Sequence, residues 1–395
     1  MNTKKNLKSQ MNVAVVYHSA AAYREPLFKL LFSKDDLPIK FTLFSGRSSN
    51  ESTIRLMDTG LGSPPTGNGR LNWHLIRNFW LGQFLFQPYV LLLPWQRKWD
   101  CVIFLGNPYY ITTWFSALLC RLRGKKILMW THGYRALERS RIKRLFKNCF
   151  YKLADGLVLY GERAKDILNQ EGFDPKCLFV AYNSAPGVPA PTPLLAQNSN
   201  FLSFKHAAPT IIWVGRMTPA KELSLLVEAV NKLHAAGTLC NVVLIGNGPE
   251  RSNIIQQVAA RKLDDYFHLP GAIHDTTKLS AYLNSAHVAV SPGAIGLFAI
   301  LAHGYGLPVI TNDNFATQGP EVEIILDNET GSFFSENDSD ALANALGDWL
   351  SIPTKRRRAK ALCVERVTKC YTPEAQLQVL MRAVDAVCDK PYSEK

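Results

Sequence analysis

The chain has 395 residues, a net charge of +13 and a pI near 9.3, with 47% hydrophobic and 19% charged residues. This length suits two domains rather than one core, and the hydrophobic content excludes disorder as the default state. The positive charge favours an anionic partner, which is nucleic acid, phospholipid headgroups or a phosphorylated small molecule.

The cysteines and the N-terminus argue against secretion. Eight cysteines form no CxxC pair and have no histidine at metal-ligand spacing, so buried thiols in a reducing cytoplasm are expected. The first apolar run is one strand long and ends at His18, which is too short for a signal peptide. Residues 79–94 are the most apolar stretch but are interrupted and shorter than the roughly 20 residues that cross a bilayer.

Short apolar or β-branched runs alternate with segments of helical periodicity along the whole chain. This pattern predicts an α/β fold in which parallel sheets are covered by helices on both faces. Three helical segments follow the last predicted strand, and the final one begins near residue 373. The predicted strands are 12–17, 39–44, 101–105, 126–130 and 156–160 in the first half, and 210–214, 241–245, 266–269, 288–291 and 308–311 in the second.

A segment rich in Pro, Ser and Asn, residues 185–209, separates the two halves and has no periodicity, which is typical of a linker. Two Rossmann-like domains joined in this way are expected to face each other across a cleft, where the carboxyl ends of parallel strands bind ligands. We predict an N-terminal acceptor-side domain (11–185), a linker (186–209), a C-terminal donor-binding domain (210–372) and a C-terminal helix and tail (373–395) that packs back on the first domain.

Two polar positions of the first half follow predicted strands. His132 ends the strand 126–130, and it is either a ligand contact or a structural histidine. Arg24 lies in the first turn between a strand and a helix, where it either meets an acceptor phosphate or complements a neighbouring acid.

The segment 135–152 is strongly basic on one helical face and apolar on the other, with seven Lys or Arg and one acid. Two interpretations stay open. The helix packs on its sheet with its charges in water, or it docks on anionic lipid together with the aromatic-rich region 73–99. The run KRRRAK at 355–360 has no interleaved aromatic residues, so no nucleic-acid partner is expected.

The second half places cations and glycines after its strands. Gly215 and Arg216 follow the strand 210–214, and Lys221 lies one helical turn further on, although each cation would also be ordinary as a solvated surface charge. Glycines in two later turns would let a ligand approach the backbone and the amide groups that begin a helix. These are Gly246 and Gly248, and then Gly293 and Gly296.

The order of these motifs resembles glycosyltransferase family 4, the retaining enzymes of the GT-B fold. The resemblance covers residues 210–334 and rests on GRMTPAKE, IGNGPE, SPGAIGLFAILAHGYGLPVIT and EIILDNETGSFF. It implies that a sugar moves from a nucleotide diphosphate donor to a hydroxyl of a glycan or polyprenyl-diphosphate-linked acceptor. The implied setting is bacterial surface polysaccharide synthesis (O-antigen, capsule or exopolysaccharide) in the cytoplasm, peripheral on the inner face of the cell membrane.

By the same resemblance, Arg216 and Lys221 bind the donor diphosphate, and the amides around Gly296 and Leu297 hold it from the opposite side. His132 would touch the donor sugar or its phosphate. No metal and no further cofactor are expected, because fixed cations stabilise the leaving diphosphate and no DxD-type motif is evident.

The sequence departs from the family at its E-x7-E glutamates, since Gly293 and Leu301 occupy those two positions. Glu321 and Glu323 follow the strand 308–311 and either offer a carboxylate to the site or lie solvated in a loop. A non-catalytic nucleotide-sugar-binding or scaffold relative therefore stays an alternative. A dinucleotide-dependent oxidoreductase is a third reading, but no GxGxxG follows the first strand.

Overall fold

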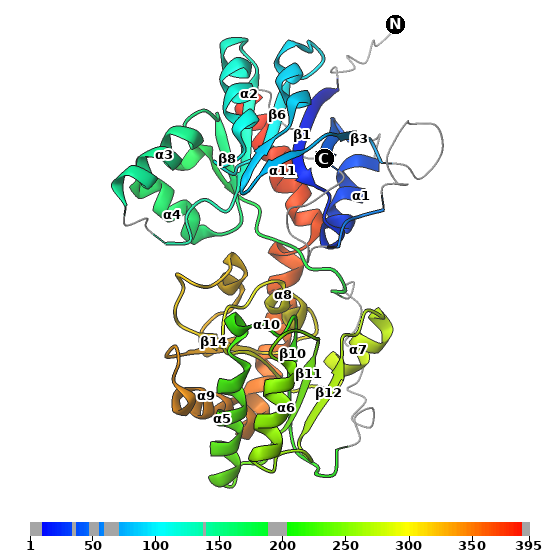
Figure 1. Ribbon diagram of the computed structural model, residues 1–395, viewed down its shortest axis with the longest axis vertical. Coiled ribbons are helices and arrows are strands. Elements are labelled where there is room, and N and C mark those ends of the chain that lie inside the picture. The colour runs from blue at the N-terminus through cyan, green and yellow to red at the C-terminus, as the bar shows by residue number, and fades with distance from the viewer. Residues whose placement is uncertain are drawn as a thin grey trace, which may run out of the picture. The chain divides into compact units, whose positions relative to one another are not determined.

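The computed structural model describes residues 10–33, 37–46, 55–58, 71–136, 140–188 and 204–388. The chain forms two compact units (Figure 1). The first unit comprises Met1–Tyr182 and Pro373–Lys395, and the second comprises Asn183–Thr372. The chain therefore leaves the first unit after Tyr182 and returns to it at Pro373. Most of the predicted linker lies outside the described residues, and residues 183–188 belong to the second unit.

A parallel sheet of seven strands forms the centre of the first unit, in the order β3-β2-β1-β6-β7-β8-β9. Consecutive parallel strands need a crossover, so the helices lie on the two faces of the sheet. The strands are β1 (Met11–Ser19), β2 (Ile39–Gly46), β3 (Trp73–Ile76), β6 (Cys101–Leu105), β7 (Lys126–Thr131), β8 (Gly156–Leu159) and β9 (Leu178–Val180).

All five strands predicted for the first half are confirmed. The sequence missed the two edge strands β3 and β9, which are only four and three residues long and too short to show an alternating pattern. It also missed an antiparallel hairpin outside the sheet, formed by β4 (Phe79–Leu81) and β5 (Phe84–Phe86).

Two groups of helices cover the first sheet. One face packs against α1 (Glu25–Ser33) and α11 (Pro373–Cys388), and the other against α2 (Ile111–Leu122), α3 (Arg141–Tyr151), α4 (Glu162–Gln170) and the 3-10 segment η3 (Pro88–Trp95). Short 3-10 turns, η1 (Ala22–Arg24) and η4 (Pro175–Cys177), complete the connections.

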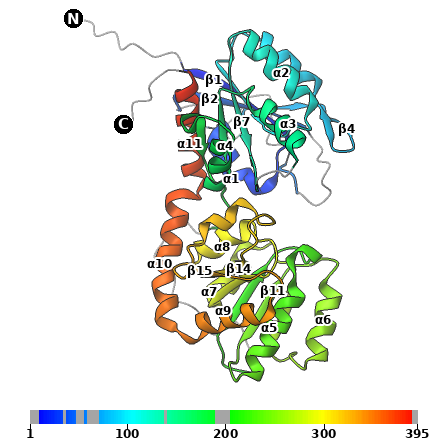
Figure 2. The same cartoon turned by 90° about the vertical axis from the view of Figure 1, so that its left-hand side faces the viewer.

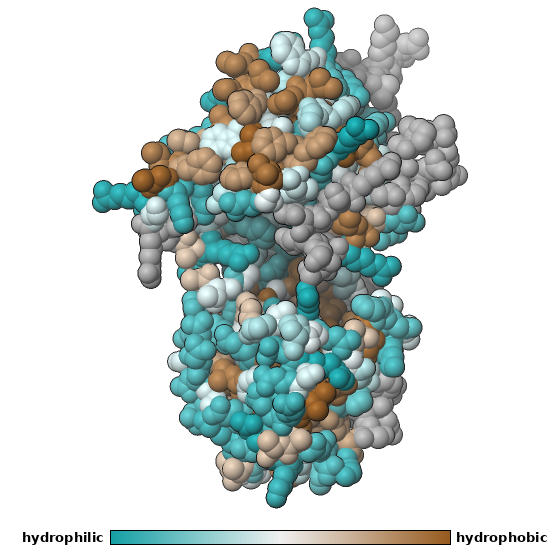
Figure 3. Space-filling view, in the orientation of Figure 1, coloured by the Kyte–Doolittle hydropathy of each residue, from teal (hydrophilic) through white to brown (hydrophobic). Residues whose placement is uncertain are grey.

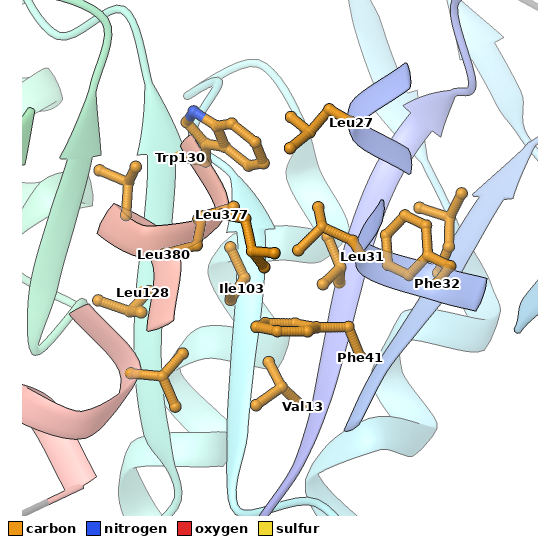
Figure 4. Close-up of a cluster of buried hydrophobic side chains, with 14 of the residues drawn as sticks. Val13, Leu27, Leu31, Phe32, Phe41, Ile103, Leu128, Trp130, Leu377 and Leu380 are labelled. Carbon is orange, nitrogen blue, oxygen red and sulfur yellow. The ribbon is translucent and has the colours of Figure 1, made fainter. Parts of the chain in front are cut away.

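The C-terminal helix α11 is part of the first unit's core, as the sequence predicted. Its side chains Leu377, Leu380 and Val384 recur at helical spacing and are buried against Leu31 of α1 and the sheet. Figure 4 shows Leu377 and Leu380 beside the strand side chains, and Figure 2 shows α11 in the first unit in a view turned by 90° from Figure 1. The last helix therefore ties the end of the chain to the first domain.

The second unit has a six-stranded parallel sheet in the order β12-β11-β10-β13-β14-β15. Its core gathers side chains of α5, α6, α9 and α10 on the sheet. The strands are β10 (Thr210–Val214), β11 (Asn241–Ile245), β12 (Phe267–Gly271), β13 (Val288–Ser291), β14 (Val309–Asn312) and β15 (Gly331–Phe334). The helices are α5 (Leu223–Ala235), α6 (Arg251–Ala260), α7 (Thr276–Ser285), α8 (Leu297–Gly304), α9 (Ser339–Ser351) and α10 (Pro353–Cys370).

The five strands predicted for the second half are also confirmed, with shifts of one residue at the start of β12 and β14. The sequence missed β15, whose first residue is a glycine. A side chain there would meet the carbonyl oxygen of Val309 at 1.9 Å, so only Gly331 lets this edge strand pair with β14. No helix in the described parts of the chain is long and apolar enough to cross a membrane.

Replacing Leu380 by alanine is expected to destabilise the first unit, because this α11 side chain is only 1% exposed. Deleting a buried leucine costs about 2 to 5 kcal/mol of unfolding free energy. Urea unfolding followed by circular dichroism measures the loss. Arg382→Ala, on the exposed side of the same helix, is the control. Equal unfolding midpoints for the two variants would contradict the packing of α11.

Candidate functional site

A pocket of about 330 Å³ opens in the second unit, at the carboxyl ends of β10 and β13 and at the start of α8. Ligands bind to parallel sheets at this edge. Apart from two cations, its walls are mostly apolar or backbone. The lining residues are Ala185, Pro186, Trp213, Val214, Gly215, Arg216, Lys221, Ser291, Ile295, Gly296, Leu297, Phe298 and Leu301.

Both predicted cations, Arg216 and Lys221, line this pocket, together with Gly215. Arg216 is exposed directly after β10, and its guanidinium pairs with no residue that the structure describes. Lys221 ends the short 3-10 segment η5 (Pro219–Lys221) and is half-buried. The pocket therefore presents an unpaired guanidinium and an ammonium to one small volume, which is an arrangement suited to an anion.

The position of Lys221 is fixed by backbone contacts with the loop before α8. The amide of Gly293 donates to the carbonyl of Lys221 at 3.1 Å, and the amide of Ala294 donates to the carbonyl of Ala220 at 3.1 Å. The Lys221 Nζ donates back to the carbonyl of Ala294. Burial lowers the pKa of Lys221 below its ordinary value, while the nearby Glu321 acts in the opposite direction.

Glu222, which follows Lys221, has a left-handed backbone with φ of 51°. A residue with a side chain pays about 1 to 2 kcal/mol for this conformation. The turn lets the chain pass directly from η5 into α5 while Lys221 stays at the pocket. Such strain is typical of functional sites, where the surrounding structure holds it in place.

The N-terminus of α8 also faces the pocket, since Gly296, Leu297 and Phe298 line it. The first amides of a helix have no partner within it, and no side chain caps α8 at Gly296. These amides and the helix dipole attract an anion. Gly296 and Leu297, which the sequence predicted to bind the diphosphate, thus line the same pocket as Arg216 and Lys221.

A buried polar network that the sequence did not reveal holds the loop before α8. The Gln318 side chain accepts from the amide of Ile295 at 2.8 Å and donates to the Thr311 hydroxyl at 3.1 Å. Asn312 donates to the carbonyl of Pro292 at 2.7 Å. These residues carry no motif of their own, although the polar run at 311–314, which begins inside β14, was a signal for a loop that supports a site.

The structure explains why Gly293 stands where the family has its first glutamate. A Cβ at this position would lie 2.1 Å from the carbonyl oxygen of Ala220 and 2.9 Å from the carbonyl carbon of Lys221. The backbone of η5 occupies the space that a glutamate side chain would need. At the second glutamate position, Leu301 is buried and lines the pocket, so that wall is apolar.

The two loop glutamates have different surroundings. Glu321 is 6% exposed, accepts a hydrogen bond from the Asn183 side chain at 2.9 Å and acts on the charge of Lys221. Glu323 is half-buried, and its backbone carbonyl accepts from Arg366 at 2.9 Å. Neither residue lines the pocket. Of the two, Glu321 is the carboxylate coupled to the cationic wall, whereas a ligand contact of Glu323 stays a prediction.

Gly246 and Gly248 allow two loops of the second unit to pack together. A Cβ on Gly246 would lie 1.7 Å from the carbonyl oxygen of Gly215, and one on Gly248 would lie 2.2 Å from that of Met217. Neither glycine lines the pocket. The two glycines thus support the loop that carries Gly215 and Arg216. Direct binding of substrate by Gly246 and Gly248 stays a prediction.

His132 follows β7 in the first unit, as predicted, and is exposed. Its ring stands 4.5 Å from the ring of Tyr160. Surrounding protein atoms, followed by the charges of Arg135 and Arg24, lower the pKa of His132 below its ordinary value. The imidazole is therefore neutral near pH 7 and can accept a hydrogen bond from a sugar hydroxyl.

Arg24 is buried in the first unit within a box of aromatic rings. Its guanidinium lies 5.2 to 5.7 Å from the ring centres of four residues and donates to the Tyr160 hydroxyl at 2.5 Å. No acid pairs with it among the described residues, and its second terminal nitrogen has no hydrogen-bond partner there. The complementing acid that the sequence allowed is absent from this environment, while binding of an acceptor phosphate stays a prediction. The four rings belong to Tyr17, Tyr23, Trp130 and Tyr160.

Replacing Gly293 by alanine is expected to destabilise the second unit, because the new methyl group would collide with the backbone at Ala220. Forcing a methyl group into a packed site costs about 1 to 3 kcal/mol. Gly296→Ala is the matched control, since its Cβ would meet nothing within 4 Å and its φ of 176° suits any residue. Thermal unfolding compares the two. If the two variants unfold at the same temperature, η5 does not pack against residue 293 as described.

Comparison with known proteins shows which family and which relatives the chain resembles. Residues 196–361 match the family described as glycosyl transferases group 1. The GDP-mannose-dependent alpha-(1-6)-phosphatidylinositol dimannoside mannosyltransferase of Mycobacterium tuberculosis is 26% identical over 172 residues, which cover 42% of this chain and 42% of that protein. A sucrose synthase of Acidithiobacillus caldus is 29% identical over 197 residues, covering 44% of this chain and 24% of that protein. The match thus spans less than half the length of these relatives.

Solved structures match over nearly the whole chain. The lipopolysaccharide outer core galactosyltransferase WaaB superposes with a TM-score of 0.68 at 14% identity, covering 95% of this chain and 99% of that one. HepE of Anabaena in complex with UDP superposes with a TM-score of 0.67 at 14% identity, covering 95% and 100%. Residues 196–361 thus match the glycosyl transferases group 1 family, and the chain as a whole has the GT-B fold of the glycosyltransferases with which it superposes.

Proposed function

We propose that the protein is a retaining glycosyltransferase that moves a sugar from a nucleotide diphosphate donor to a hydroxyl group of an acceptor. One observation carries the proposal. Arg216, Lys221 and the uncapped start of α8 converge on one pocket in the region that matches the family. A diphosphate would meet a guanidinium, an ammonium and backbone amides there at once.

The comparisons support a nucleotide diphosphate as the donor. HepE was solved with UDP and with UDP-glucose, and the mycobacterial relative is named for GDP-mannose. These donors differ in base and sugar and share the diphosphate. In our proposal the cationic pocket binds this common part, and the apolar wall of Trp213, Ile295 and Leu301 packs against the remainder of the donor.

The proposed chemistry follows from the charge that develops on the leaving group. As the bond between the sugar and the phosphate breaks, negative charge grows on the diphosphate, and Arg216, Lys221 and the α8 amides stabilise it. The acceptor hydroxyl then bonds to the same face of the oxocarbenium-like sugar, and a phosphate oxygen accepts its proton. The anomeric configuration is thereby retained, which proton NMR of the product tests directly.

This route requires neither a carboxylate nucleophile nor a metal ion from the protein. It fits a site in which the backbone of η5 fills the place of the first family glutamate at Gly293. Neutral His132 would hold a hydroxyl of the donor sugar or its phosphate, and Arg24 an acceptor phosphate. Glu321 would keep Lys221 charged and in place by its electrostatic effect.

For the acceptor we propose a glycan or polyprenyl-diphosphate-linked glycan of bacterial surface polysaccharide synthesis, at the inner face of the cell membrane. The names of two similar proteins support this class, because one refers to phosphatidylinositol dimannoside and the other to the lipopolysaccharide outer core. The protein would thus work in the cytoplasm as a peripheral enzyme.

A non-catalytic donor-binding or scaffold protein is the second candidate. The absence of both family glutamates, at Gly293 and Leu301, is the observation that favours it. Such a protein would bind a nucleotide sugar without consuming it. Screening UDP-, GDP- and dTDP-sugars by thermal shift, and then following donor consumption with a membrane extract as acceptor, separates the two candidates.

Replacing Arg216 or Lys221 by alanine is expected to lower kcat by about 100- to 1000-fold, because each removes a charge that stabilises the leaving diphosphate. Release of the nucleoside diphosphate measures turnover. Lys205→Ala is the control, since this exposed lysine of the second unit pairs with Asp265 and does not line the pocket. Activity equal to wild type in both site variants would refute the phosphate assignment.

A further inference from the structure

Large apolar side chains are exposed on one part of the first unit. Of the 16 large hydrophobic residues that are exposed in the described chain, 13 fall between residues 79 and 146. The other three are Leu239, Ile255 and Ile352 of the second unit. Single exposed hydrophobic residues are ordinary, but a concentration of them on one surface marks an interaction site.

Helix α2 presents an apolar stripe to solvent. Phe115, Leu118 and Leu122 recur at spacings of three and four residues and are exposed, Leu122 to 74%. Ala117 and Cys120 on the opposite side are buried in the core. Small residues of the helix therefore face the core together with Trp114, whereas Phe115, Leu118 and Leu122 face solvent.

Helix α3 has the same unusual arrangement. Ile142 and Leu145 are 81% and 64% exposed, and Phe146 is exposed beside them, whereas Phe150 and Tyr151 at the end of the helix are buried. The sequence left open whether the apolar side of this helix packs on the sheet or meets a lipid surface. The first interpretation holds in part, because Phe150 and Tyr151 pack in the core at the end of the helix, whereas Ile142, Leu145 and Phe146 do not pack on the sheet.

Ring contacts join these helices and the β4-β5 hairpin into one surface. The ring centres of Trp114 in α2 and Phe146 in α3 lie 5.1 Å apart, and those of Phe84 in the hairpin and Tyr109, two residues before α2, lie 5.9 Å apart. Figure 3 shows apolar side chains gathered over this part of the first unit. We name this surface the apolar face. Its exposed residues are Phe79, Leu81, Phe84, Tyr109, Phe115, Leu118, Leu122, Ile142, Leu145 and Phe146.

The surroundings of the apolar face are strongly basic. Residues 79–152 contain 13 Lys or Arg and only two acids. Arg121 and Arg123 at the end of α2 donate to backbone carbonyls, those of Lys152 and Pro94, rather than to carboxylates. Arg141 and Lys143 are exposed at the start of α3. Apolar side chains and cations therefore lie together on the same two helices.

We propose that the apolar face docks on an anionic phospholipid bilayer. Its leucine, isoleucine and phenylalanine side chains enter the boundary of the acyl chains, and the surrounding cations bind the headgroups. A second copy of the chain suits this surface less well, because two such faces would bring their cations together. The proposal names the part of the protein that would contact the membrane in the proposed function. It does not depend on the transferase chemistry.

The experiment uses the full chain and sedimentation with vesicles of phosphatidylcholine, with and without phosphatidylglycerol. Wild-type protein is expected to sediment with the anionic vesicles and to stay in solution with the neutral ones. The triple variant Leu122→Ser, Ile142→Ser, Leu145→Ser is expected to bind about tenfold or more weakly, because three inserted side chains are lost. The matched control is Leu239→Ser, Ile255→Ser, Ile352→Ser, which changes the three exposed residues of the second unit and should bind as wild type.

Three results would overturn the proposal. Wild-type protein does not bind anionic vesicles, the triple variant binds as strongly as wild type, or sedimentation velocity shows a wild-type dimer that the triple variant abolishes. Thermal unfolding confirms that the variants fold. A further variant, Arg141→Glu with Lys143→Glu, should bind anionic vesicles more weakly than wild type. Donor consumption with a water-soluble acceptor should be unchanged in the triple variant, so failure of the docking proposal and failure of the proposed function are distinguishable.

Discussion

The contact between the backbone of η5 and Gly293 is the constraint on which the candidate site depends. Two amide hydrogen bonds of 3.1 Å join the loop before α8 to Ala220 and Lys221, and a Cβ at residue 293 would leave no room for them. This contact sets Lys221 beside the N-terminus of α8. The same contact leaves no room at residue 293 for the glutamate that the family resemblance implies there. The position of Lys221 and the absence of a carboxylate at residue 293 thus have the same structural cause.

The chemistry we propose is consistent with that constraint. A site without a nucleophile can still accelerate sugar transfer if it stabilises the departing diphosphate, and fixed cations and helix amides do this without reorganisation. The strained turn at Glu222 and the buried network around Gln318 hold these groups in position. Glu321 adds a carboxylate near Lys221 without lining the pocket, so it acts on the charge of the wall rather than on a ligand directly.

Much of the fold could be predicted from the sequence, because the buried strands are continuous apolar runs and α11 has a clear helical stripe. The edge strands β3, β9 and β15 could not, since three or four residues carry no period. In the site, the motifs pointed to Arg216 and Lys221, which line one pocket of the second unit, while their binding of phosphate stays a prediction. The motifs could not show that Gly246 and Gly248 serve loop packing, or that α3 exposes Ile142, Leu145 and Phe146, because both depend on neighbours distant in the sequence.

The most direct test of the central claim is a crystal structure of the protein with a bound nucleoside diphosphate, guided by whichever base stabilises the protein against heat. The account predicts that the diphosphate lies in the pocket of the second unit, bonded to Arg216, Lys221 and the first amides of α8. A diphosphate held instead by the turn at Gly246 and Gly248, with Arg216 and Lys221 unengaged, would contradict it.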